Sequence, residues 1–329
     1  MEGIMEQRKL NWGIVGIGWI GSDMAEALLE VNGEVYAAVA RNAEKGKAFQ
    51  EKFKVQQMYA TSEELMADEN VDIVYIATPH SSHYEIMKMA LLAGKHVFSE
   101  KSATVSSRQL EECVMIAKEK NLVISDGATL LHMPLYKKLH SIVESGELGS
   151  VKMVQVNFGS CREYDPQSRF FSKDLAGGAL LDIGVYATSF ARFFMKSAPN
   201  VVLTTANFFE NGVDETSGII LKNPDGEMAV MALTMCAKQP KRGVVACEKG
   251  YIEICEYPRA SKATITYTES GNVRIIEAGS TEKALQYEIE DMQDYVLNGT
   301  GEDNLQIVRD VMAILTSVRN QWGLVYPFE

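Results

Sequence analysis

The stretch GIVGIGWIGSDM, residues 13–24, decides the fold of this chain. Its three glycines, Gly16, Gly18 and Gly21, have the spacing GxGxxG between an apolar run and a helical pattern. In that setting the first glycine permits a tight turn, the second lets the backbone approach a pyrophosphate, and the third lets a helix pack closely on a strand. We interpret the stretch as a dinucleotide-binding loop. Three turn glycines on a ligand-free α/β fold are the alternative.

Strands alternate with helices around this loop over residues 1–126. Short apolar runs predict strands at residues 10–15, 35–40, 57–60, 71–77, 96–100 and 122–125. Helical patterns lie between them, with capping-box spacing at Thr61 and Glu64, at Ser82 and Glu85, and at Ser106 and Gln109. Unbroken apolar strands imply a parallel sheet that is covered on both faces. Residues 1–126 are therefore predicted to form an α/β, doubly wound Rossmann domain that binds a dinucleotide.

After residue 126 the pattern changes to longer strands rich in β-branched residues. Helices are expected at 134–149, 285–297 and 304–321. Strands are expected at 152–158, 200–209, 213–223, 227–236, 263–268 and 272–278, with a hairpin turn NPDG at 223–226. Residues 127–329 are thus predicted to form an α+β domain on an open, mostly antiparallel sheet, which binds the substrate. Such a sheet needs a cover for its outer face, and a homodimer or homotetramer would provide one.

Length and composition limit the classes of function. A chain of 329 residues favours two domains. Its formal net charge of −12 argues against a nucleic-acid surface, which needs clustered Lys and Arg. The five cysteines are odd in number and lack CxxC spacing, so we expect neither a disulfide framework nor a metal site. The start, MEGIMEQRKLNW, lacks a signal peptide and no apolar run is long enough to cross a membrane, so we expect a cytoplasmic protein.

The end of the second predicted strand bears on the choice of cofactor. An NAD-selective site usually has Asp or Glu there, which accepts a hydrogen bond from the ribose 2′-hydroxyl. This chain has Ala40 and then Arg41, with Lys45 one helical turn later. A guanidinium can bind a 2′-phosphate through two hydrogen bonds. The predicted cofactor is therefore NADP in preference to NAD, and a solvated surface arginine is the alternative.

Polar side chains follow the fourth and fifth predicted strands. Thr78, His80 and His83 follow the fourth strand, and Glu100 and Lys101 follow the fifth. Ligands of open α/β sheets bind outside the carboxyl ends of the strands, so we expect these side chains to meet at the cofactor crevice. For the two histidines, a position on the surface is the alternative.

The chain contains four segments in a fixed order: GIVGIGWIG, ATPHSSHYE, SEKS and GGALLDIGVY. Together they resemble the glucose-fructose oxidoreductase/inositol dehydrogenase/rhizopine catabolism (Gfo/Idh/MocA) family, and the resemblance covers nearly the whole chain. The last segment, residues 177–186, is similar to the branch with glucose-fructose oxidoreductase, dimeric dihydrodiol dehydrogenase and NADP-dependent xylose dehydrogenases. The resemblance implies an NAD(P)-dependent oxidoreductase that transfers hydride between nicotinamide C4 and a hydroxyl-bearing or carbonyl carbon of a sugar, polyol or related small diol. A catalytically inactive NAD(P)-binding regulator or sensor is the alternative.

The resemblance also implies which residues form the site. Lys101 matches a lysine of the family that contacts both the substrate and the nicotinamide ribose, and Asp182 and Tyr186 match its active-site pair in the second domain. Ser102 stands where the family usually has proline, so Lys101 is expected to be less restrained. The residues expected to bind the cofactor are Gly16, Gly18, Trp19, Ile20, Gly21, Arg41, Thr78, His83, Glu100 and Lys101.

The chemistry of these residues supports a proton relay. Oxidation of an alcohol needs a group that takes the hydroxyl proton, and a phenol with a pKa near 10 is a poor base at neutral pH. A neighbouring ammonium lowers that pKa, so Tyr186 with Lys101 is a coherent pair. If residues 180–194 form a helix, Asp182 shares a face with Tyr186 and could orient the substrate or Lys101. The preceding loop, unless it is an ordinary surface loop, offers further candidates for the substrate pocket: Arg162, Tyr164 and Arg169.

Overall fold

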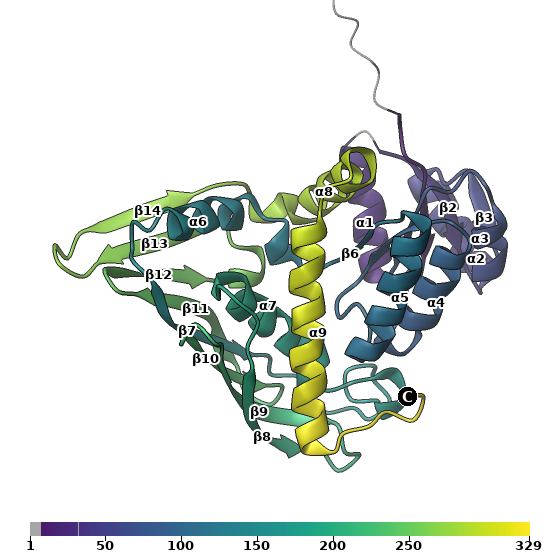
Figure 1. Ribbon diagram of the computed structural model, residues 1–329. Helices are drawn as coiled ribbons and strands as arrows, with labels where there is room; N and C mark the ends of the chain where they lie inside the picture. The colour runs from purple at the N-terminus through teal and green to yellow at the C-terminus, as the bar shows by residue number, and fades with distance from the viewer. Residues whose placement is uncertain (1–7, 32) are drawn as a thin grey trace, which may run out of the picture.

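The computed structural model describes residues 8–31 and 33–329 and contains two β-sheets (Figure 1). The first sheet has six parallel strands in the order β3-β2-β1-β4-β5-β6. Their bounds are β1 Trp12–Val15, β2 Val35–Val39, β3 Gln57–Tyr59, β4 Ile73–Ile76, β5 His96–Ser99 and β6 Ile124–Asp126. This is the strand order of dinucleotide-binding folds, so the predicted doubly wound sheet is confirmed. The prediction that the chain starts without a signal peptide rests largely on residues 1–7, which lie outside the described residues.

Helices cover both faces of the first sheet. They are α1 Trp19–Glu30, α2 Ala43–Phe53, α3 Ser62–Ala67, α4 His80–Leu92 and α5 Ser107–Lys120. Successive residues of a strand point to opposite faces, and here both faces are buried. Tyr75 packs in the core that contains α1, and the adjacent Val74 and Ile76 pack in the core on the opposite face. Helix α8 (Ala284–Asn298), from the other end of the chain, contributes Ile289 and Met292 to the α1 side.

The helix starts agree only partly with the capping patterns. Thr61 and Glu64 form the predicted capping box at the start of α3. The box predicted at Ser82 is wrong because α4 begins two residues earlier, and the Ser82 hydroxyl instead donates to the Thr78 hydroxyl at 2.8 Å. Ser106 precedes α5 as its N-cap residue, but its side chain makes no capping hydrogen bond.

The second sheet has eight strands in the order β14-β13-β12-β11-β7-β10-β9-β8. Strands β7 and β10 pair in parallel and the other neighbours pair antiparallel, so the predicted mostly antiparallel sheet is confirmed. The bounds are β7 Val151–Gly159, β8 Val201–Phe208, β9 Asp214–Lys222, β10 Met228–Thr234, β11 Gln239–Cys247, β12 Gly250–Cys255, β13 Lys262–Tyr267 and β14 Val273–Glu277. Strands β11 and β12 have no counterpart among the predicted strands, because Pro240, Lys241 and Arg242 interrupt the apolar pattern of β11.

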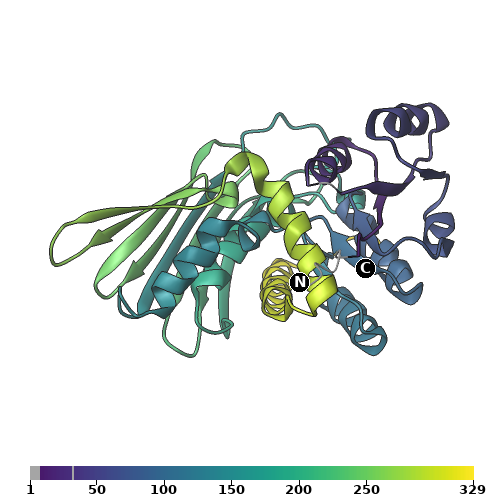
Figure 2. The ribbon, with the colours of Figure 1, turned by 90° about the horizontal axis from the view of Figure 1, so that it is seen from above.

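Helices pack on one face of the second sheet (Figure 2). They are α6 (Pro134–Glu144), which is shorter than predicted, α7 (Val185–Phe194) and α9 (Glu302–Trp322). Helix α9 also packs on α5, so it joins the two halves of the chain. The opposite face of the sheet exposes apolar side chains, among them Leu203, Ile220, Val230 and Ile275. Within the described residues, no helix combines the length and the apolar character that a membrane span requires.

Candidate active site

The glycine loop between β1 and α1 has the geometry of a phosphate-binding turn. Gly16 has a φ of 107°, and a Cβ there would lie 2.7 Å from the carbonyl oxygen that follows β4. A Cβ on Gly21 would collide with the Gly16 carbonyl oxygen, whereas a Cβ on Gly18 would meet no atom within 4 Å. Helix α1 begins at Trp19, so the N–H groups of Trp19 and Ile20 lack intrahelical partners. The close packing behind the loop and the open space at Gly18 fit a bound pyrophosphate.

A cleft of about 730 Å³ lies at the carboxyl ends of the strands of the first sheet, with residues of the second sheet on its other side. Ligands of open α/β sheets bind at this edge. Of the residues predicted to be catalytic or to bind the cofactor, eight line the cleft: Gly18, Trp19, Ile20, Thr78, Glu100, Lys101, Asp182 and Tyr186. Gly16, Gly21, Arg41 and His83 lie outside this lining.

Lys101 follows β5 and is anchored by the second half of the chain. Its Nζ donates hydrogen bonds to the Asp182 backbone oxygen at 2.7 Å and to Asp182 Oδ1 at 3.2 Å, and its side chain is only 13% exposed. Burial alone would lower the pKa of Lys101, but the negative charge of Asp182, together with Tyr186 and Glu100, outweighs burial and raises it. Burial alone would raise the pKa of Asp182, but the charge of Lys101 outweighs burial there and lowers it. Asp182 therefore holds the Lys101 side chain, and the expectation that Ser102 leaves Lys101 less restrained than proline would leave it stays a prediction.

Tyr186 lies beside Lys101, but their contact differs from the predicted one. The Lys101 Nζ lies over the aromatic ring, 4.7 Å from its centroid, in a cation–π geometry. Burial raises the pKa of the Tyr186 phenol, and the opposing charge of Lys101 only partly offsets this effect. The prediction that Lys101 brings the pKa of Tyr186 below its usual value is thus wrong for the free protein. Tyr186 is a neutral phenol at neutral pH and can donate a proton.

Asp182 and Tyr186 stand on a helix that begins with a π-helical turn. This turn, Leu180–Gly184, leads directly into α7, and such turns are frequent at functional sites. The buried Asp214 carboxylate accepts a hydrogen bond from the Leu180 N–H at 2.6 Å and so fixes the start of the helix. Burial raises the pKa of Asp214 to about 6. The sequence pattern missed Asp214, because it lies 34 residues from Leu180 and no local motif links the two.

Two histidines support the backbone around Lys101. The Nδ1 and Nε2 of His83 lie 2.9 Å and 2.8 Å from the carbonyl oxygens of Ser102 and Thr78, and the Nε2 of His80 lies 3.1 Å from the Lys101 carbonyl oxygen. Both rings are buried, which lowers their pKa, so the alternative of surface histidines is wrong. His80 lines the cleft, whereas His83 lies behind it. As a cofactor contact, His83 stays a prediction.

Buried acids adjoin Lys101. Glu100 accepts a hydrogen bond from the Tyr75 hydroxyl at 2.5 Å, and burial raises its pKa. Burial also raises the pKa of Asp126 to about 6 and that of Glu288 to about 7. Neither carboxyl oxygen of Glu288 has a partner within hydrogen-bond geometry among the described residues, and the nearby Thr129 side chain offsets only part of the effect of burial on its pKa. Asp126 and Glu288 could not be recognised from sequence, because segments far apart in the chain create their environment.

The loop after β7 contributes two arginines to the cleft. The guanidinium carbons of Arg162 and Arg169 lie 3.7 Å and 4.2 Å from the centroid of the Phe170 ring. Both arginines line the cleft, whereas Tyr164 stacks on Phe209 outside its lining. Three further cations in the lining have no sequence motif: Lys238, Lys241 and Arg259.

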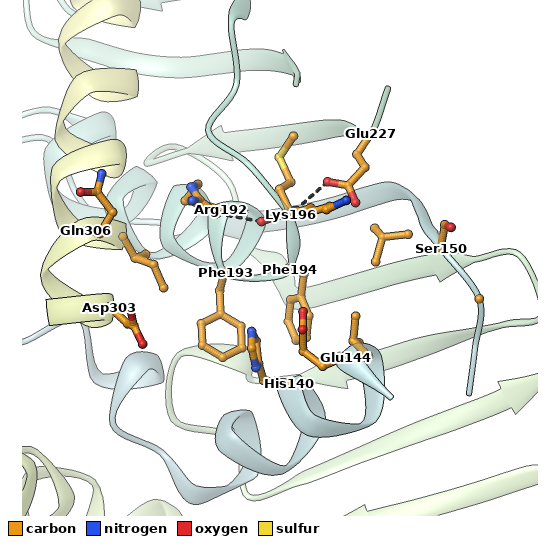
Figure 3. A pocket seen from close by; sticks show the side chains of 15 residues that line it. His140, Glu144, Ser150, Arg192, Phe193, Phe194, Lys196, Glu227, Asp303 and Gln306 are labelled. Carbon is orange, nitrogen blue, oxygen red and sulfur yellow. Dashed lines mark hydrogen bonds between the residues drawn. The ribbon is translucent and has the colours of Figure 1, made fainter. Parts of the chain in front are cut away.

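A second cavity, of about 390 Å³, is lined by residues of α6, α7 and α9 (Figure 3). The two cations in its lining have acidic partners: Arg192 Nε donates to Asp310 at 2.7 Å, and Lys196 Nζ lies 3.6 Å from a carboxylate oxygen of Asp225. The glycine loop and Lys101 lie outside this cavity. Within residues 8–31 and 33–329, no group of three or more His, Cys, Asp or Glu side chains could hold a metal ion.

Comparisons with known proteins agree with this arrangement. A family model described as "Oxidoreductase family, NAD-binding Rossmann fold" matches residues 10–128, and a "GFO/IDH/MocA C-terminal domain" matches residues 136–253. Trans-1,2-dihydrobenzene-1,2-diol dehydrogenase of Xenopus tropicalis is 28% identical over 332 residues, which cover 96% of this chain and 99% of that protein. The Sus scrofa enzyme of the same name is 30% identical over 251 residues, 75% of this chain and 74% of that protein.

Solved structures with the same fold include two oxidoreductases. A 3-ketoreductase from Actinomadura kijaniata, in complex with NADP and TDP-benzene, has a TM-score of 0.83 at 21% identity and covers 95% of this chain and 98% of its own. A levoglucosan dehydrogenase in complex with NADH has a TM-score of 0.84 at 18% identity and covers 94% and 97%. At this identity the likeness shows the fold alone. The two family models and the Sus scrofa relative show that the chain belongs to the Gfo/Idh/MocA family of NAD(P)-dependent oxidoreductases.

Proposed function

We propose that the protein interconverts a hydroxyl and a carbonyl group on a sugar, a polyol or a related small diol, with NADP preferred over NAD. When bound, the nicotinamide cofactor supplies or accepts the hydride. The observation that carries the proposal is that the glycine loop, Lys101 and Tyr186 line one cleft. The relatives' names, dihydrodiol dehydrogenase, levoglucosan dehydrogenase and ketoreductase, support the same class of substrate.

Tyr186 moves the proton in this proposal. In the reducing direction its neutral phenol donates a proton to the carbonyl oxygen of the substrate, and in the oxidising direction the phenolate takes the hydroxyl proton. The Lys101 ammonium over the ring stabilises the phenolate in both directions. Asp182 holds Lys101 in place through the two hydrogen bonds to its Nζ, so it acts as a positioning residue.

Arg41 supports the preference for NADP. It is exposed directly after β2, the strand that pairs with β1 and its glycine loop. Ala40 and Asn42 flank it, so no carboxylate adjoins it in sequence to repel a 2′-phosphate. A guanidinium at this strand end can bind the phosphate through two hydrogen bonds.

The exposed face of the second sheet supports a homo-oligomer, as a homodimer or homotetramer. Leu203, Ile220, Val230 and Ile275 lie on four different strands and are between 38% and 57% exposed. A second copy of the chain on this face would bury them. We also propose a cytoplasmic location, because an odd number of cysteines, all five of them free, fits a reducing compartment.

A substrate screen tests the reaction. Aldoses, inositols and vicinal diols are incubated with NADP, and the absorbance of the reduced cofactor is followed. We expect turnover to fall about 100-fold or more in Lys101→Ala and in Tyr186→Phe, because general acid–base catalysis contributes at that level. Lys249→Ala and Tyr267→Phe serve as matched controls, since both residues lie in the β11–β13 part of the second sheet, outside the cleft.

Two results would contradict the proposal. Undiminished turnover in both Lys101→Ala and Tyr186→Phe would remove the proton relay. Tight cofactor binding without turnover of any compound, in either direction, would favour the regulator or sensor instead.

A further inference from the structure

The cleft is strongly cationic although the chain as a whole is acidic. Two carboxylates line it, Glu100 and Asp182, against six cationic side chains: Lys101, Arg162, Arg169, Lys238, Lys241 and Arg259. The formal net charge of the chain is −12. Charge of one sign in a cleft focuses the electric field there and raises the local concentration of ligands of the opposite sign.

Several of these cations have no acidic partner inside the protein. Lys101 pairs with Asp182, and Lys241 with Glu256 at 3.4 Å. The other four form no salt bridge with a carboxylate of the described chain: Arg162, Arg169, Lys238 and Arg259. The second cavity differs, because each of its two lining cations, Arg192 and Lys196, has a carboxylate partner. Unpaired cations that share a cleft repel one another, and a bound anion removes that repulsion.

Arg162 and Arg169 share a contact with one ring on the second half of the chain, and Lys238 lines the same cleft. The two guanidinium groups flank the Phe170 ring at 3.7 Å and 4.2 Å, so one ring holds both. Backbone hydrogen bonds from Arg162 N to the Met235 oxygen at 3.0 Å, and from Ser160 N to the Thr234 oxygen at 2.9 Å, align this loop with the segment that leads to Lys238. Guanidinium groups bind carboxylate and phosphate through paired hydrogen bonds.

This group is separate from the parts of the chain that suit the cofactor phosphates. The pyrophosphate fits the glycine loop at Gly18, and the proposed contact of the 2′-phosphate is Arg41. Gly18 and Arg41 follow strands β1 and β2 of the first sheet. The group lines the same cleft as Lys101, Asp182 and Tyr186, the residues of the proposed proton relay. With the cofactor phosphates assigned to the glycine loop and to Arg41, these three cations remain available to the substrate.

We infer that the substrate carries an anionic group, a carboxylate or a phosphate, which binds to Arg162, Arg169 and Lys238 while its hydroxyl or carbonyl carbon lies beside Tyr186. The inference rests on the proposed function, because it specifies the substrate of that same site. The chemical class is a sugar acid or a phosphorylated sugar or polyol. Binding of the anionic group away from the reacting carbon also positions that carbon for the reaction.

Matched substrates test the inference. D-Glucose, D-glucuronate and D-glucose 6-phosphate differ at C6 alone, and the galactose and mannose series offer the same comparison with other ring configurations. Each series is assayed with NADP, and the corresponding keto compounds with NADPH. We expect the anionic members to have a kcat/KM at least about tenfold above that of the neutral sugar, since hydrogen bonds to a charged group contribute at that level. A preference for only the carboxylates or only the phosphates identifies the kind of anion.

Variants then assign the effect to the arginines. Arg162→Gln and Arg169→Gln should each raise KM for the anionic substrate about tenfold or more, with a smaller change in kcat and a clearly smaller change in KM for the neutral sugar. Arg169→Lys should restore part of the loss, and the melting temperature of each variant reports whether it folds. Arg108→Gln is the control, because it removes the same charge from an exposed position on α5, away from the cleft.

A binding measurement separates this inference from the proposed function. If no sugar in the panel is turned over, D-glucuronate and D-glucose 6-phosphate are titrated calorimetrically into the NADP-loaded protein. Binding that is weakened in Arg162→Gln and Arg169→Gln supports the anion site even though the reaction has not been found. Turnover of neutral sugars as good as that of the anionic ones overturns the inference but leaves the proposed function standing, and so does an equal loss for both substrate types in the arginine variants. Absence of binding by either anion overturns the inference as well.

Discussion

Replacing Glu288 with glutamine should change how the stability of the protein depends on pH. Glu288 is buried at 1% exposure, both of its carboxyl oxygens lack a hydrogen-bond partner in the described structure, and it adjoins the acids near Lys101. Burial raises its pKa from the ordinary value of 4.5 to about 7. Glutamine has nearly the same shape and does not ionise. The variant therefore isolates the free energy of ionising this one side chain.

The sign and size of the effect follow from proton linkage. Between pH 4.5 and 7 the folded protein holds the Glu288 proton and the unfolded chain does not, so the free energy of unfolding falls as pH rises. A shift of about 2.5 pH units corresponds to roughly 3 kcal/mol, all of it lost above pH 7. About 2 kcal/mol of that loss falls between pH 5.5 and pH 8.5. The glutamine variant should gain this amount relative to the wild type over the same interval.

Melting temperatures of the two proteins at both pH values measure the effect. With an unfolding entropy of about 2.1 cal/mol/K per residue, roughly 2 kcal/mol corresponds to a change of about 3 °C in the difference between variant and wild type. Groups that do not interact with Glu288, such as Asp126, titrate in both proteins and cancel in that difference, whereas the loss of the Glu288 charge also lowers the pKa of His132. Glu290→Gln, at an exposed position of the same helix, should show a difference that is independent of pH. A Glu288→Gln difference that is equal at pH 5.5 and pH 8.5 would refute the reasoning.

Three further predictions concern the cofactor, the lysine and the assembly. Arg41→Ala should weaken NADPH binding about 10- to 100-fold and leave NADH binding unchanged in fluorescence titrations, because one charged contact is lost; wild-type protein that binds NADH as tightly as NADPH would contradict this. Asp182→Asn should lower kcat/KM about tenfold or more, because Lys101 keeps the backbone contact and loses the carboxylate; an unchanged rate would show that Asp182 does not position Lys101. Val230→Lys should dissociate the proposed oligomer in light-scattering measurements, because it places a charge on the exposed sheet face; an unchanged mass would place the interface elsewhere.

The first half of the site could be predicted from sequence because its chemistry is local. Gly16, Gly18 and Gly21 lie within six residues, and the strand before them and the helix after them are recognisable from short patterns. The carboxyl ends of parallel strands meet at one edge of a sheet, so Thr78, Glu100 and Lys101 could be placed in a common cleft from the sequence alone.

The rest depends on burial and on contacts between distant segments. The direction of the pKa shift of Tyr186 was predicted wrongly, because the nearby ammonium could be inferred and the stronger effect of burial could not. From the sequence, buried and surface positions were equally plausible for the two histidines. The carbonyl oxygens beside their ring nitrogens, at Thr78, Lys101 and Ser102, come together only in the fold. Lys238 directly precedes β11, a strand that the sequence pattern did not predict. Its position in the cleft could therefore not be predicted either.

Ser102 shows where the restraint on Lys101 comes from. A proline in its place would have limited the backbone of the preceding lysine, so its absence predicted a looser side chain. In the structure, Asp182 holds the Lys101 ammonium and the Ser102 hydroxyl donates to the Leu181 carbonyl oxygen at 3.1 Å. Leu181 directly precedes Asp182, so this hydrogen bond ties the segment that carries the lysine to the helix that carries its carboxylate. Proline has no hydroxyl to donate, and the serine therefore supplies, through a buried hydrogen bond to the segment that carries Asp182, a restraint that proline would supply within the backbone.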